Sequence, residues 1–251
     1  MQNARSESRK RSHPPQGRAG TGAERAIGIR ESTCVDLSRL KPLPRKFYDR
    51  DPRTVSRELL GKIVVRGEMA GRIVETEAYL GADDAAAHAA AGKTARNAVL
   101  WGPPGYAYVY FIYGNHFCLN VSCLPDGEAG GVLFRALEPL AGLEEMARER
   151  GLELTPRNLP LLTSGPGRLC EAMGITRLRD NGADMTSRAS GLWIGNDGYR
   201  PRKIVVTPRV GITKSAEAPL RYFIEGNEFV SGPKIQGKQV LRPRKKRSAS
   251  G

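Results

Sequence analysis

Apolar and β-branched residues occur in short runs along the chain, and most of these runs alternate with polar residues as half-buried strands do. Several runs are separated by only a few turn-forming residues, which favours antiparallel pairing over a doubly wound fold. The pattern therefore predicts one mixed α+β domain, in which a curved antiparallel β-sheet is flanked by helices. We expect its strands at 62–66, 72–81, 130–140, 193–198, 203–212 and 221–226.

The clearest local pattern is a predicted hairpin in segment 106–124, which holds four of the eight tyrosines. Aromatic and β-branched residues run up to Gly114-Asn115, and a second alternating run leaves it. Glycine and asparagine tolerate positive φ, so we expect a protruding β-hairpin closed by a two-residue turn. Tyr113 falls at its tip, where its own strand cannot easily bury it. It is either a satellite contact of the sheet or a wedge directed at a partner.

Helical patterns lie between the predicted strands. Asp51 suits the N-cap of the first helix, and Pro52 suits its first turn. The second helix is Ala-rich and carries Asp83 and Asp84 near its N-terminal end, where negative charge is favourable. We expect helices over 52–61, 83–92 and 140–151, and after the Gly/Pro loop at 164–167.

Composition sets the size of the core and the kind of partner. With 251 residues and 39% hydrophobic content, the chain can build one sizeable core, which we place at 40–237. The net charge of +14 indicates a polyanionic partner. Much of it lies in two tails, 1–39 and 238–251, for which we expect disorder. Such tails are typical of non-specific nucleic-acid arms, of a nuclear address, or of solvated ends without a function.

The cysteines and the apolar runs indicate a compartment. Four cysteines without CxxC spacing favour reduced thiols in an intracellular protein. No apolar run approaches membrane-spanning length, and the N-terminus lacks a signal-peptide pattern. We therefore expect an intracellular protein without membrane association.

Candidate chemistry begins in segment 72–81, where alternation places Glu75, Glu77 and Tyr79 on one face of a strand. A buried carboxylate is costly unless it is partnered, so this face is either solvated at a sheet edge or part of a site. In a site, a carboxylate near an apolar pocket has a raised pKa and can activate water as a general base. Arg135, which lies among apolar residues on another strand, is a natural counter-charge or one half of a structural ion pair.

Two further features have weaker implications. His88 follows this strand closely, but a lone histidine is more often a satisfied polar residue, and its spacing from the two preceding aspartates matches no metal motif. We expect no metal. In SGPGRLC, the backbone N–H groups of Gly165 and Gly167 and the side chain of Arg168 would suit a phosphate. A plain Gly/Pro loop that enters a helix has the same pattern.

Taken in order, these motifs resemble the alkyladenine (3-methyladenine) DNA glycosylase family. The resemblance runs from about residue 40 to about residue 232. It implies a monofunctional base-excision repair enzyme without cofactors, which hydrolyses the N-glycosidic bond of 3-methyladenine, 7-methylguanine, hypoxanthine or ethenoadenine in double-stranded DNA. We expect a monomer associated with DNA, in a bacterial nucleoid or a eukaryotic nucleus. The resemblance rests on RIVETEAYLG, the following segment with His88, TARN, YVYFIYGNHFCLNVS, VLFRALEPLAG, TSGPGRLC and PLRYF.

The resemblance also implies catalytic roles. Glu77 matches the glutamate that deprotonates the attacking water. Arg135 and the backbone carbonyl of Val210 match the groups that help to hold this water. The hairpin of the family enters the minor groove, and its tip residue, here Tyr113, fills the gap left by the flipped nucleotide.

The same resemblance assigns the base-binding groups. Tyr79, His88 and Tyr110 match the walls that sandwich the extruded base. Asn120 matches the residue that screens out guanine by a clash with its amino group. The residues expected at the DNA backbone are Arg96, Gly165, Gly167 and Arg168.

Two other functions fit parts of the sequence. One is a lesion-binding module without turnover, against which the presence of Glu77 together with Arg135 argues. The other is the similar sheet of a formyltransferase C-terminal domain, which binds RNA and needs neither a tip tyrosine nor a stacking cluster. A Schiff-base lyase is disfavoured because no lysine falls on the strand positions that face the site, although Lys93 and Lys214 are nearby.

Overall fold

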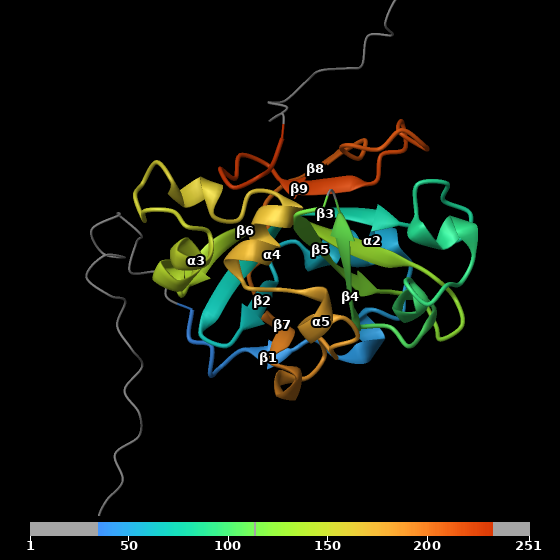
Figure 1. Ribbon diagram of the computed structural model, residues 1–251, viewed down its shortest axis with the longest axis horizontal. Helices are drawn as coiled ribbons and strands as arrows, with labels where there is room; N and C mark the ends of the chain where they lie inside the picture. The colour runs from blue at the N-terminus through green and yellow to red at the C-terminus, as the bar shows by residue number, and fades with distance from the viewer. Residues whose placement is uncertain (1–34, 113, 233–251) are drawn as a thin grey trace, which may run out of the picture.

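A curved antiparallel sheet organises the computed structural model, which describes residues 35–112 and 114–232 (Figure 1). In this part of the chain the sheet has nine strands in the order β1-β7-β2-β3-β6-β5-β4, with β8 and β9 attached off this path. The strands are β1 (Lys41–Pro42), β2 (Ile63–Arg66), β3 (Met69–Tyr79), β4 (Ala107–Ile112), β5 (His116–Ser122), β6 (Gly131–Ala141), β7 (Leu192–Asn196), β8 (Ile204–Thr207) and β9 (Arg221–Ile224).

Strand β3 is the branch point of the sheet. Strand β6 pairs along one side of it, while its other side pairs first with β2 and then, from Glu75 to Glu77, with β9. The β3–β6 register shifts on both sides of Glu75. Such irregularities bend a strand and increase its twist. Strand β3 is thus irregular at Glu75, two residues before Glu77.

Short helices pack around the sheet. Asp51 accepts a hydrogen bond from the Arg53 backbone N–H and caps α2, whose Val55 and Leu59 enter the main core. In Figure 1, α4 and α5 lie in front of the sheet. The α-helices are α2 (Pro52–Leu59), α3 (Leu143–Glu149), α4 (Pro166–Ala172) and α5 (Arg177–Asp180), and the 3-10 helices are η2 (Arg45–Phe47), η3 (His88–Ala91), η4 (Ala98–Trp101), η5 (Leu159–Leu161) and η6 (Arg188–Ser190). None of the helices within 35–112 and 114–232 is long and apolar enough to cross a membrane.

The predicted fold class is confirmed: one mixed α+β domain with a curved antiparallel sheet and a β4–β5 hairpin. The domain boundaries stay predictions, because both tails extend outside the described residues. The predicted helix over 83–92 is wrong, since only the 3-10 helix η3 forms there. The longer helix does not form because of Asp84. Its carboxylate binds the buried Arg209 and accepts hydrogen bonds from two backbone N–H groups of its own loop.

The hairpin turn also differs from the expectation. Ile112 pairs with His116, so three residues connect the strands instead of two. Gly114 has a φ of 76°, in the left-handed region that favours glycine. Asn115 has no positive φ. Tyr113, the predicted wedge, lies outside the described residues.

Candidate active site

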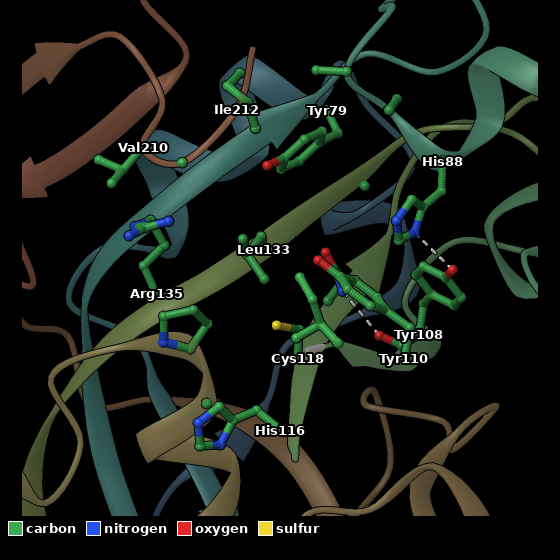
Figure 2. Close-up of a pocket in the computed structure, with 18 of the residues that line it drawn as sticks. Tyr79, His88, Tyr108, Tyr110, His116, Cys118, Leu133, Arg135, Val210 and Ile212 are labelled. Carbon is green, nitrogen blue, oxygen red and sulfur yellow. Dashed lines mark hydrogen bonds between the residues drawn. The ribbon is translucent and has the colours of Figure 1, made fainter. Parts of the chain in front are cut away.

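A cavity of about 520 Å³ opens at one end of the curved sheet. It lies where β3, β4, β5 and β6 come together, and loops on either side of them complete its rim. The lining is mainly apolar and aromatic, with a few polar groups, as is usual for small-molecule sites. Its chemically informative members are Tyr79, His88, Tyr108, Tyr110, Cys118, Asn120, Leu133, Arg135 and Val210 (Figure 2).

Glu77 lies directly behind this lining and is fully buried. One carboxylate oxygen faces Arg135 Nη1 at 3.1 Å and accepts the Val210 backbone N–H at 2.8 Å. The other accepts the Tyr79 hydroxyl at 3.1 Å. Burial raises the pKa of Glu77 above its usual value, and the Arg135 charge and the two hydrogen bonds oppose this shift only in part. The carboxylate is thereby coupled to three residues that line the cavity.

Glu75 lies on the same face of β3 and is also fully buried. One of its oxygens accepts from Arg135 Nε at 2.9 Å and from Arg221 Nε at 2.6 Å. The other accepts the Ser231 backbone N–H at 2.6 Å. The predicted shared face is therefore correct, and the alternative of a solvated edge is wrong. Arg135 bridges both glutamates.

Aromatic rings form the walls of the cavity. The His88 and Tyr110 rings have centroids 4.4 Å apart at 73°, and His88 Nδ1 lies 2.9 Å from the Tyr108 hydroxyl. Figure 2 shows the Tyr79, His88 and Tyr110 rings directed into the same space. Burial lowers the pKa of His88, and the nearby Arg96 charge lowers it further. At neutral pH, this wall therefore presents an uncharged imidazole.

Asn120 and Tyr108 complete the polar part of the lining. Asn120 is almost fully buried and donates from Nδ2 to the Tyr108 carbonyl at 3.1 Å, which fixes its amide in the wall. The Tyr108 hydroxyl also reaches His88, so this side chain contributes more than packing against the sheet. Strand alternation places positions 108 and 110 on the same face, so this signal was available in the sequence.

The predicted DNA-backbone residues lie at the edge of the cavity or near it. Gly165, Gly167 and Arg168 form one part of the rim. A Cβ on Gly167 would come within 2.9 Å of the His116 ring, so this close packing requires glycine. Arg96 lies beside the hairpin, with Nη2 3.4 Å from the Phe111 carbonyl. Contact of these residues with DNA stays a prediction.

A metal site was a minor alternative for the segment around His88. Asp84 Oδ2 lies 2.5 Å from Arg209 Nη1, so this carboxylate is already neutralised by an arginine. Within 35–112 and 114–232, no three His, Cys, Asp or Glu side chains lie together as metal ligands would. The described cysteines Cys118, Cys123 and Cys170 are buried free thiols.

The fold places a cavity with aromatic walls in front of the buried carboxylate of Glu77. In comparison with known proteins, the model of the methylpurine-DNA glycosylase family matches residues 46–228. The chain belongs to this family. It is a DNA glycosylase, an enzyme that hydrolyses N-glycosyl bonds and acts on DNA. The resemblance noted in the sequence is confirmed, and the module without turnover is disfavoured.

Similar proteins occur in several bacteria. A relative from Koribacter versatilis (strain Ellin345) is 68% identical over 200 residues, which cover 78% of this chain and 96% of the relative. One from Burkholderia lata is 48% identical over 193 residues, covering 76% and 91%. One from Alkaliphilus oremlandii is 47% identical over 201 residues, covering 75% and 98%. Each bears the name "Putative 3-methyladenine DNA glycosylase".

Proposed function

We propose that this enzyme removes alkylated or deaminated purines from double-stranded DNA by hydrolysing the N-glycosidic bond. The observation that carries the proposal is the aromatic cavity of about 520 Å³ with the buried carboxylate of Glu77 behind its wall. The bond to be cleaved is unreachable inside the base stack, so the nucleotide must be extruded into the cavity. The relatives' names point to the same kind of substrate, with 3-methyladenine as the first candidate.

Recognition of the extruded base rests on stacking. Tyr79, His88 and Tyr110 offer ring faces, and an electron-poor alkylated purine stacks well on electron-rich rings. An uncharged His88 avoids repulsion with a cationic base. The fixed amide of Asn120 clashes with the exocyclic amino group of guanine, which keeps normal guanine out.

Catalysis rests on Glu77 and Arg135. In the reacting complex, water displaces the Tyr79 hydroxyl from the carboxylate of Glu77. Its oxygen bonds to C1′ of the sugar while the C1′–N bond breaks, the purine leaves with the bonding electrons, and the proton of the water passes to Glu77. Arg135 keeps the carboxylate ionised for this step, and the Val210 N–H orients it. The Val210 carbonyl is the further acceptor for the water.

The product is an abasic site rather than a nicked strand. Among the described residues that line the cavity none is a lysine, so no amine there is placed to form a Schiff base with the sugar. Tyr113 fills the gap in the duplex, and the DNA backbone lies along Arg96 and the 165–168 rim. The enzyme acts as a monomer, without a cofactor, inside the cell on chromosomal DNA.

A panel of duplexes that each carry one damaged purine tests this proposal. The full chain is incubated in chelator-containing buffer with 3-methyladenine, 7-methylguanine, hypoxanthine or ethenoadenine duplexes, and half of each sample is then treated with alkali. We expect strand breaks at the lesion only after alkali, because an abasic site is alkali-labile. Breaks without alkali would show a lyase, and no release from any duplex would refute the proposed substrates.

A further inference from the structure

A buried ion pair behind the cavity has no role in the chemistry described above. Arg209 Nη1 and Nη2 contact the two oxygens of Asp84 at 2.5 and 2.8 Å, and the side chains are 0% and 2% exposed. Arg209 Nη1 also donates to the Ala78 carbonyl at 3.0 Å. Neither side chain lines the cavity. Burying two charges costs much of what their attraction returns, so such a pair is weak evidence for stability alone.

The pair is connected to both aromatic walls. The Arg209 guanidinium lies over the Tyr79 ring, 4.6 Å from its centroid, on β3. The Asp84 carboxylate accepts the backbone N–H groups of Leu80 and Ala86 at 3.2 and 3.1 Å, which shapes the loop that leads to His88. One ion pair therefore holds a ring of one wall and the backbone that carries the other.

The pair is also connected to the carboxylate of the site. Val210, the neighbour of Arg209 in the chain, donates its N–H to Glu77 at 2.8 Å. Tyr79, beneath the guanidinium, donates its hydroxyl to the same carboxylate at 3.1 Å. Displacing Arg209 would therefore move two of the groups that orient Glu77.

We propose that Asp84 and Arg209 are positioning residues that fix the spacing of the Tyr79 and His88 walls and their alignment with Glu77. The proposal rests on the proposed base-excision function. If the Asp84–Arg209 ion pair is weakened, the distance between the Tyr79 and His88 walls increases. The damaged base then stacks less well, and undamaged purines are excluded less strictly. Positioning errors of about 1 Å can cost on the order of a hundredfold in rate, so we expect large effects from residues that never touch the base.

The test compares Asp84→Asn with Asp180→Asn. Asp180 is an equally buried aspartate, paired with Arg66 at 2.5 Å and absent from the cavity lining, so it controls for the loss of a buried ion pair. Single-turnover release of the damaged base, release of an undamaged purine, and affinity for an abasic-site duplex are measured well below each melting temperature. We expect D84N to lose roughly 10–100-fold in damaged-base release and in the damaged-to-normal ratio, with abasic-site affinity nearly unchanged. D180N should keep the wild-type values.

A second variant keeps the test decisive if D84N does not fold. Arg209→Lys retains the charge but cannot make the two-oxygen contact, so it should show an intermediate loss in the same two readouts. Wild-type release and selectivity in D84N and R209K, or equal losses in D84N and D180N, would overturn the positioning role. Failure of the wild-type chain to release any damaged base would instead refute the function on which the proposal rests.

Discussion

Two carboxylates on the same buried face of β3 have different partners. Glu75 and Glu77 are two residues apart on β3, both are fully buried, and both contact Arg135. Glu75 has a second arginine, Arg221, and the Ser231 N–H, and neither of these two partners lines the cavity. Among the described residues, only Arg135 lies within ion-pair distance of Glu77, and Arg209 acts on it from further away. Its other partners, Tyr79 and Val210, line the cavity.

The difference shows how one strand supplies both a structural and a chemical carboxylate. The carboxylate oxygens of Glu75 are occupied by two guanidinium groups and a backbone N–H, so they have a structural role in holding Arg135, Arg221 and Ser231. A buried carboxylate with less compensation keeps a raised pKa and can accept a proton from water. Arg135 forms an ion pair with both carboxylates, so the position of Glu77 depends on Glu75.

The largest expected difference between Glu75 and Glu77 is in the effect of a glutamine replacement on the free energy of unfolding. Glu75→Gln leaves Arg135 and Arg221 short of a counter-charge, so we expect a loss of about 3–5 kcal/mol in the free energy of unfolding. Glu77→Gln should cost less, because Glu77 has one arginine ion pair where Glu75 has two, and Arg135 keeps its pair with Glu75. Urea denaturation of both variants checks this. Equal losses would show that the two carboxylates have the same structural role.

The pH dependence of the chemical step sharpens the comparison. Glu77 must be ionised to take a proton, and its pKa is raised, so release should start to fall while the pH is still above 4.5. Below the raised pKa, the single-turnover rate should drop about tenfold per pH unit. His88 has a lowered pKa and protonates only below 6.5. His88→Gln should therefore leave the pH at which release falls unchanged. If the fall at acidic pH is lost in this variant, it must be assigned to His88 instead of Glu77.

The smallest expected effect concerns the wall of the cavity that His88 and Tyr108 form. Tyr108→Phe removes the hydroxyl partner of His88 but keeps the ring, so we expect a loss of about 1 kcal/mol and a few-fold slower release. Stability and single-turnover release are measured on the same preparation. Tyr199→Phe is a suitable control, because Tyr199 is an exposed tyrosine outside the cavity. A loss in the control as large as in Y108F would remove the special role of the hydroxyl.

Much of the site was predictable because strand alternation is a short-range rule. It placed Glu75, Glu77 and Tyr79 on one face of a strand. The failed helix prediction involves a partner that is distant in sequence. The alanines of 83–92 favour a helix, but Asp84 is drawn to Arg209, and no local pattern reveals a contact across 125 positions. Likewise, only the folded sheet shows that Arg221 neutralises Glu75.

The most direct test of the proposed role of Glu77 is single-turnover release of 3-methyladenine or hypoxanthine from a single-lesion duplex by the wild type and Glu77→Gln. Binding to the same duplex is measured in parallel. Glu138→Gln serves as the matched control, because Glu138 lies on β6 outside the cavity and contacts Asn227. We predict a loss of roughly 10²–10⁴-fold in release for E77Q, with lesion binding retained and wild-type release in E138Q. Release by E77Q at the wild-type rate would contradict the role of Glu77 as the base that activates water.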